Sequence, residues 1–179
     1  MLRSVDIRKK AENLKAGDRV SLFGYVYTAR DEAHRLLTCL IEKDRPLPFE
    51  LKDSVIYYAG PTETPANLPI GSCGPTTSGR MDKFTPKLLD FGLAATIGKG
   101  ERSSSVIEAI VRNKAVYFAA VGGAGALAAQ CVKSVEVIAF PELGCESIKR
   151  LYFENFPLIV AIDSEGNDLY KAGRLKYSE

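Results

Sequence analysis

Two hydrophobic patterns follow one another in the first quarter of the chain. Residues 20–27 place Val20, Leu22 and Val26 on one face of an extended segment, which predicts a β-strand. Residues 31–42 then carry apolar side chains at a spacing of three to four, which predicts an amphipathic helix. The acidic residues at the start of this segment suit the first turn of a helix. The chain therefore opens with a strand that leads into a helix.

The same alternation continues toward the C-terminus. Predicted strands cover residues 54–58, 93–97, 115–121 and 132–140, and predicted helices cover residues 81–91, 103–112 and a short segment that begins near 125. Two further apolar segments lie at 148–153 and 158–162, separated by polar residues and a proline. Strands that alternate with helices predict an α/β fold. The length of 179 residues predicts a single domain over residues 1–179.

Composition and charge narrow the class of protein. Hydrophobic residues make up 46% of the chain and charged residues 26%, which is typical of a globular protein with its own core. The formal net charge is +2, from 24 basic and 22 acidic residues. No strong overall field therefore favours a nucleic-acid partner, and we expect none. A bound anion must be held by a local cluster of cations.

The cysteines bear on metal binding and on location. Cys39, Cys73, Cys131 and Cys145 form no CxxC pair, and His34 is the single histidine, so the sequence predicts no metal site built by this chain alone. We expect a reduced, cytoplasmic protein in which most of the cysteines are small buried side chains. The charged N-terminal segment lacks the apolar stretch of a signal peptide.

One uncharged stretch has the length of a marginal membrane span. Residues 115–132 contain no charged side chain, but they are rich in alanine and glycine and poor in large apolar residues. The glycines near the middle divide the stretch into a strand pattern and the start of a short helix. We therefore expect no membrane span.

The segment GPTTSGRM, residues 74–81, has the richest chemistry in the chain. Its hydroxyl groups, exposed amides and guanidinium together suit a carboxylate or a phosphate. A plainer interpretation makes Thr76, Thr77 or Ser78 a helix N-cap and Arg80 a solvated residue of the first turn. The composition of the segment favours neither interpretation.

Two more cations lie where a predicted strand ends. Arg30 falls between the first strand and its helix, and Lys99 stands in a Gly-Lys-Gly turn that lacks the spacing of a phosphate-binding P-loop. A lone surface cation usually serves solubility. Together with Arg80, however, these residues could converge at one edge of a sheet, which is where α/β proteins bind ligands. His34 lies on the flank of its helix, where packing is a better interpretation than catalysis.

The motifs of the chain, taken together, resemble those of a known family. Matching segments occur, in order, at ARDEAH (29–34), YYAGPT (57–62), GPTTSGRMD (74–82), IGKGER (97–102), YFAAVGGAGALAA (117–129) and FPLIVAIDSEGND (156–168). They resemble the β-subunit of class I fumarate hydratases and L-tartrate dehydratases, the two-component iron–sulfur hydro-lyases. The resemblance covers roughly residues 15–170, and the combination of motifs is far more specific than any one of them.

The resemblance implies a fold, a partner and roles for four residues. The β-subunit is a swivelling β/β/α domain, and it closes over a 4Fe-4S cluster that three cysteines of a separate α-subunit hold. Arg30, Arg80 and Lys99 correspond by motif to binders of the substrate carboxylates, and Thr76 corresponds to the proposed catalytic base. Three cations would neutralise the two carboxylates of a dicarboxylate substrate and still favour additional negative charge.

The implied function is one half of a hydro-lyase. The chain would interconvert fumarate and (S)-malate in a hetero-oligomer with its α-subunit, and two α and two β chains are the natural expectation. L(+)-tartrate dehydratase is the alternative within the family, since the two substrates differ by one hydroxyl group. A free-standing carboxylate-binding module of the same fold is the alternative from another class.

Overall fold

Five of seven β-strands close into a barrel in the computed structural model, which describes residues 1–177. The ring runs β2, β3, β4, β5, β7 and back to β2. Strands β2 to β5 are parallel to one another, and β7 is antiparallel to both of its neighbours in the ring. The strands are β1 (Leu2–Arg3), β2 (Arg19–Thr28), β3 (Val55–Tyr57), β4 (Ala95–Gly98), β5 (Val116–Ala119), β6 (Val132–Ala139) and β7 (Ile148–Ile162).

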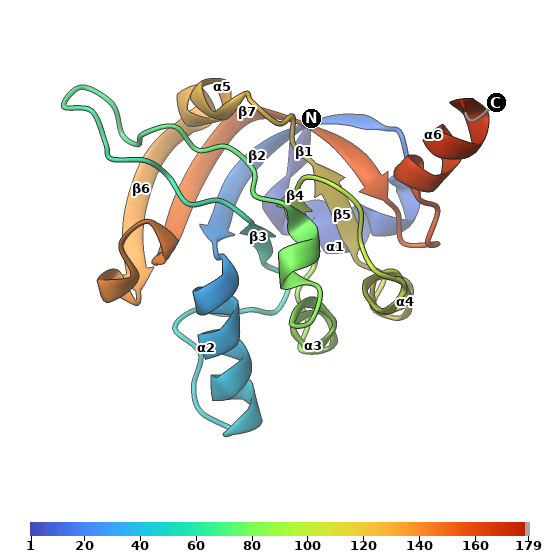
Figure 1. Ribbon diagram of the computed structural model, residues 1–179, viewed down its shortest axis with the longest axis horizontal. Helices are drawn as coiled ribbons and strands as arrows, with labels where there is room; N and C mark the ends of the chain where they lie inside the picture. Colours follow the sequence, from blue (N-terminus) through green and yellow to red (C-terminus); the bar gives the residue numbers. More distant parts are fainter. Residues whose placement is uncertain (178–179) are drawn as a thin grey trace.

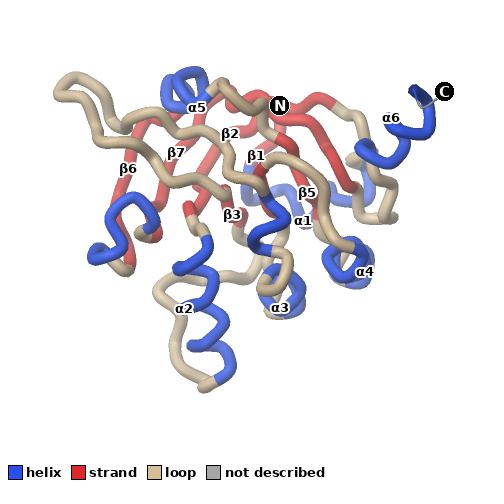
Figure 2. Tube along the Cα trace, viewed as in Figure 1, coloured by secondary structure: helices blue, strands red, loops and turns tan. Residues whose placement is uncertain are grey.

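The helices lie outside the barrel. Figures 1 and 2 show α2, α3 and α4 along one side of the strands, α5 on the opposite side, and α6 at one end. The α-helices are α1 (Ile7–Lys10), α2 (Asp31–Glu42), α3 (Thr85–Asp90), α4 (Ser104–Arg112), α5 (Gly125–Cys131) and α6 (Leu169–Tyr177). Short 3₁₀ turns are η1 (Ser4–Asp6), η2 (Ala11–Asn13), η3 (Ser78–Met81) and η4 (Pro141–Glu146).

Alternate residues of the strands belong to two different hydrophobic clusters. In β3, Val55 and Tyr57 belong to the cluster of the barrel, which also includes residues of α1 and α5. The intervening Ile56, and Tyr58 just after the strand, belong to the cluster that packs the barrel against α2, α3 and α4. Both faces of the strand are therefore buried. This explains why the short strands are continuous apolar runs and not alternating patterns.

The mixed α/β class predicted from the sequence is confirmed, and most elements lie within two residues of their predicted bounds. The stretch at 115–132 forms β5 and α5, as expected. Within the described residues, no helix is long and apolar enough to cross a membrane.

The division of the C-terminal apolar segments is wrong. Residues 148–162 form one continuous strand, β7, and its proline pairs opposite Ser21 of β2. Three further elements, β1, α1 and α6, were not predicted from the sequence pattern. The short β1 and α1 lack a periodic pattern long enough to be recognised.

Candidate functional site

The four residues predicted to form the site all follow the carboxyl ends of parallel strands. Arg30 lies two residues after β2, and Lys99 follows β4 directly. Thr76 and Arg80 lie between β3 and α3, with Arg80 inside η3, the green turn near the centre of Figure 1. Because β2, β3 and β4 are parallel, their carboxyl ends meet at one edge of the barrel. The structure therefore places the four residues at one edge, as the sequence predicts, while their roles stay predictions.

The backbone of Thr76 is held between β3 and the turn that carries Lys99. The N–H of Thr76 donates to the carbonyl of Tyr58 at 2.6 Å, and the N–H of Lys99 donates to the carbonyl of Thr76 at 3.3 Å. The N–H of Ser78 donates in turn to the carbonyl of Lys99 at 2.8 Å. Two hydrogen bonds thus fasten the Thr76 segment to the Lys99 turn, so the two residues are positioned together.

The capping interpretation is correct about position but not about hydrogen bonding. Thr77 is the N-cap residue of η3, but its side chain makes no capping hydrogen bond. The hydroxyl of Ser78 hydrogen-bonds that of Tyr117 at 2.9 Å, and Thr76 lies outside the turn. Among the residues that the structure describes, no hydrogen bond occupies the Thr76 hydroxyl. That hydroxyl is therefore available to a ligand.

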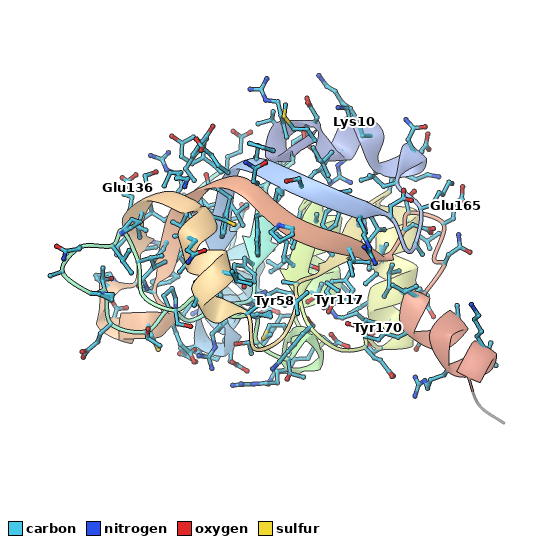
Figure 3. All side chains as sticks on the ribbon, turned by 90° about the horizontal axis from the view of Figure 1, so that it is seen from above. Lys10, Tyr58, Tyr117, Glu136, Glu165 and Tyr170 are labelled. Carbon is cyan, nitrogen blue, oxygen red and sulfur yellow. The ribbon has the colours of Figure 1, made fainter. Side chains whose placement is uncertain are left out.

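Lys99 extends from a turn that two tyrosines fix. The hydroxyl of Tyr117 donates to the carbonyl of Gly100 at 2.8 Å, and the N–H of Gly100 donates to the hydroxyl of Tyr170 at 3.1 Å. Gly100 adopts a φ of +82°, which glycine allows without strain. Tyr58, Tyr117 and Tyr170 lie in a row in Figure 3. The exposed Lys99 side chain has no ion pair with any described residue.

Arg30 lies between an acidic side chain and a glycine. Its Nη2 is 3.2 Å from a carboxylate oxygen of Glu146, and 19% of the side chain is exposed. A Cβ atom at position 60 would lie 2.7 Å from Nη1 of Arg30. The glycine of the AGPT motif therefore leaves the space that the guanidinium occupies.

Acidic side chains reduce the positive charge of the site. Arg80 donates two hydrogen bonds to the carboxylate of Asp31, and Glu146 pairs with Arg30. Three cations and two carboxylates leave a local charge of +1 and not +3. The expectation that this chain alone offers a surplus of positive charge to a dianion is therefore wrong. The motif comparison could not show this, because it identified the cations and not their partners.

A buried arginine that the sequence analysis did not single out fixes the segment after β4. The Arg102 side chain has no exposed surface, and it donates to the carboxylate of Asp82 at 2.7 Å and to the hydroxyl of Thr85 at 2.9 Å. Its guanidinium also lies over the rings of Tyr58 and Tyr117. In the sequence, Arg102 resembles an ordinary charge in a surface turn. Only the fold brings together the hydroxyl groups and rings that surround it.

His34 supports the backbone of the site and is not exposed to a ligand. Its ring is fully buried, 5.2 Å from the ring of Tyr58 between centroids. The protonated Nδ1 donates to the carbonyl of Arg30 at 2.8 Å, while Nε2 has no hydrogen-bond partner among the described residues. Burial lowers the pKa of His34 to about 4. The packing interpretation of this residue agrees with the structure.

We expect His34 to titrate with a midpoint near pH 4, where an exposed histidine would titrate near 6.5. Since the folded pKa is the lower one, the unfolded chain binds more protons between these values. The contribution of His34 to stability is therefore complete above about pH 6.5 and decreases as the pH falls toward 4. An NMR titration of the single histidine Cε1–H measures the midpoint. A midpoint near 6.5 would show that the ring is solvated.

The cysteines are less buried than the sequence analysis predicts. Cys73 is buried, Cys39 and Cys131 are half-buried, and Cys145 is exposed, and all four are free thiols. Burial raises the pKa of the Cys73 thiol to about 12, so it is protonated at neutral pH. Within the described part of the chain, no three side chains of histidine, cysteine, aspartate or glutamate form a group that could hold a metal ion. The donor set of residues 1–177 therefore does not fit a 4Fe-4S cluster.

Comparison with known proteins identifies the relatives of this chain. The sequence pattern described as "Fumarase C-terminus" matches residues 1–173. The chain belongs to this family. The chain is 43% identical over 155 residues to the anaerobic class I fumarate hydratase of Escherichia coli (strain K12), and the match covers 86% of this chain and 28% of that protein. It is 39% identical over 171 residues to fumarate hydratase 2 of Leishmania major, and the match covers 94% of this chain and 30% of that protein.

A third relative is similar in length to this chain. A Methanocaldococcus jannaschii protein, provisionally named L(+)-tartrate dehydratase subunit beta, is 40% identical over 178 residues, and the match covers 96% of this chain and 91% of the relative. By contrast, the chain spans less than a third of the two fumarate hydratases. The resemblance found in the motifs is thus confirmed, and the named relatives are hydro-lyases.

Proposed function

We propose that this chain is the β-subunit of an iron–sulfur hydro-lyase that interconverts fumarate and (S)-malate. The observation that carries the proposal is the meeting of Arg30, Arg80, Lys99 and Thr76 at one edge of the barrel. Cations at such an edge suit a dicarboxylate, and a neighbouring hydroxyl without a partner suits proton transfer. The relatives named fumarate hydratase support this choice of substrate.

Each residue has a distinct task in the proposed reaction. Arg30, Arg80 and Lys99 bind the two carboxylates of malate and fix the positions of C2 and C3 between them. The Thr76 oxygen reacts as an alkoxide that the neighbouring cations stabilise; it takes a proton from C3 and becomes a hydroxyl group, and the electron pair of the C–H bond moves onto the adjacent carboxylate. That carboxylate then carries about one additional negative charge, which a guanidinium stabilises more strongly than it stabilises the ground state. The electron pair then returns to form the C2–C3 double bond while the C2–O bond breaks, and the departing hydroxide takes up the proton held by Thr76, directly or through solvent, and leaves as water.

The charge of the site supports a requirement for a partner. A local charge of +1 does not neutralise a dianion, so further cations must come from a second chain. The described residues also lack the donor set for a cluster, and we assign the 4Fe-4S cluster to a separate α-subunit. An apolar groove of about 120 Å³ borders the site at Pro75 and Val121. Its exposed Val121 and Leu127 suit a surface that the same α-subunit covers.

The assembly follows from the same arguments. The α and β chains form a hetero-oligomer in the cytoplasm, and the domain swivels to close the edge that carries Thr76 over the α-subunit. Closure excludes water from the cations, which strengthens their interaction with the substrate. Backbone hydrogen exchange of the Thr76 segment, measured with and without a dicarboxylate, tests this movement. We expect the dicarboxylate to slow exchange in the assembled enzyme and not in the isolated chain.

L(+)-tartrate is the second candidate substrate, and one comparison favours it. The match with the relative provisionally named a tartrate dehydratase β-subunit covers 91% of the length of that relative. That relative is named as a separate β-subunit, which is also what we propose for this chain. Tartrate would place a second hydroxyl on the carbon that loses its proton, so the same four residues would bind it.

We expect the purified chain alone to remain colourless after anaerobic incubation with iron and sulfide, and to hydrate no fumarate. The reason is the separation of its cysteines and the lack of a donor cluster among the described residues. Co-expression with an α-subunit is expected to give iron–sulfur absorbance and activity on fumarate and malate, or on tartrate. Absorbance and full activity of the isolated chain would contradict the two-chain proposal. Dicarboxylate binding without activity in any assembly would support the free-standing module.

A further inference from the structure

Asp31 contacts both arginines that are predicted to bind the substrate. It accepts two hydrogen bonds from Arg80, and its Oδ2 lies 3.9 Å from Nε of Arg30. One carboxylate oxygen of Asp31 accepts from Nε of Arg80 at 3.0 Å, and the other accepts from Nη2 at 2.7 Å. Asp31 is in the first turn of α2, whereas Arg80 is in η3 after the next strand. The pair therefore connects two segments that carry predicted ligands of the same substrate.

The geometry of the pair leaves a defined part of Arg80 free. A guanidinium is planar and presents five N–H donors along fixed edges. Asp31 occupies the edge formed by Nε and Nη2, and no other described residue hydrogen-bonds the Arg80 side chain. The edge formed by Nη1 and Nη2 is consequently available to a second carboxylate in a two-bond contact.

Asp31 is itself well placed to hold this orientation. Its side chain is 33% exposed, compared with 50% for Arg80, and it begins a helix of 12 residues. A carboxylate in the first turn is stabilised by the helix dipole. A half-exposed arginine without such a partner would adopt many rotamers, and each bound substrate would have to restrict them.

We propose that Asp31 is a positioning residue that fixes the guanidinium plane of Arg80 for a substrate carboxylate. This inference rests on the proposed function, since it assigns the carboxylate to a dicarboxylate substrate of the hydro-lyase. It differs from the alternative in which Asp31 occupies the place of a substrate carboxylate in the empty enzyme. If Asp31 positions Arg80, loss of the Asp31 carboxylate lowers kcat/KM. If Asp31 instead occupies the place of the substrate carboxylate, which we call self-occupancy, its loss strengthens substrate binding.

The chain offers a matched control for Asp31. Arg112 donates from Nε and Nη2 to the two carboxylate oxygens of Asp90 at 2.8 and 2.7 Å, with similar exposure. This pair joins α4 to the end of α3 and includes none of the predicted site residues. Asp90→Asn therefore breaks the same kind of contact without altering the site.

The experiment measures kcat/KM of the α–β complex for fumarate and malate. Asp31→Asn is expected to lower kcat/KM about tenfold or more, because an amide cannot accept from both nitrogens and Arg80 loses its fixed plane. Asp90→Asn is expected to leave kcat/KM within about twofold. In an Arg80→Lys background, Asp31→Asn is expected to lower kcat/KM by a much smaller factor than in the wild type, because lysine has no guanidinium plane to fix and only the longer contact of Asp31 with Arg30 is lost.

Two results would overturn the inference. A rise in kcat/KM or a lower KM for Asp31→Asn would show self-occupancy, and an equal loss in the wild-type and Arg80→Lys backgrounds would show a general structural role. Hydrogen exchange of the Arg80 Nε proton in the isolated chain provides a readout that needs no activity. It is expected to accelerate at least about tenfold in Asp31→Asn and to remain unchanged in Asp90→Asn. If the wild-type complex acts on no dicarboxylate, the proposed function fails while this exchange measurement still tests the contact.

Discussion

Thr76→Val is expected to lower kcat of the assembled enzyme at least about a thousandfold, near the upper range for a positioned acid–base group. Valine keeps the shape of the side chain and removes the hydroxyl that has no hydrogen-bond partner among the described residues. KM is expected to change far less, since Arg30, Arg80 and Lys99 still bind the carboxylates. Steady-state kinetics of the α–β complex measure both parameters.

Two neighbouring changes make the Thr76 experiment specific. Thr77→Val alters the adjacent, exposed threonine and is expected to retain kcat within a few-fold, while Thr76→Ser is expected to retain partial activity because the hydroxyl remains. Exchange of the malate C3 proton with solvent deuterium identifies the base directly. Exchange at the wild-type rate in Thr76→Val would show that another group removes the proton.

Arg80→Ala is expected to lower kcat/KM about a hundredfold or more in the same complex, because the variant loses a charged ligand of the transition state. Folding is expected to be unaffected, since half of the Arg80 side chain is exposed and its two hydrogen bonds go to a surface carboxylate. Arg80→Lys is expected to recover little of the loss, because a point charge cannot make the two-bond contact.

Arg112→Ala is the matched control for this change. It removes an arginine of similar exposure that makes the same two-bond contact outside the site, and kcat/KM is expected to stay within about twofold. Near-normal kinetics of both Arg80→Ala and Arg80→Lys would return Arg80 to the interpretation as a solvated surface residue. Equal losses in Arg80→Ala and Arg112→Ala would indicate a general effect of surface charge.

The local elements could be predicted because their patterns are local. The stripe of α2 and the alternation of β2 repeat over enough residues to identify each element, and both were found with nearly the expected bounds. The meeting of Arg30 and Lys99 at one edge also follows from sequence, because each residue comes just after a parallel strand. A general rule for parallel sheets then places the two residues together.

Features that depend on distant pairs could not be predicted. Closure of the barrel requires β2 to pair with β7, whose residues lie more than a hundred positions later in the chain. The acidic partners of the site could not be predicted for the same reason. Glu146, which pairs with Arg30, lies in η4, far from Arg30 in the sequence. Arg102 is hidden for a related reason: its burial depends on hydroxyl groups contributed by three other segments. A charge in a sequence does not reveal which partner the fold brings to it.

The position of β7 in the ring determines when this chain can complete its fold. Without residues 148–162, β2 and β5 each present one unpaired side, and an unpaired strand can associate with another chain. During synthesis, the first 147 residues must wait for β7 before the ring can close, and contacts of such long sequence separation form slowly. We therefore expect a truncation before β7 to aggregate, and a chaperone to protect the nascent chain chiefly at these two strand edges.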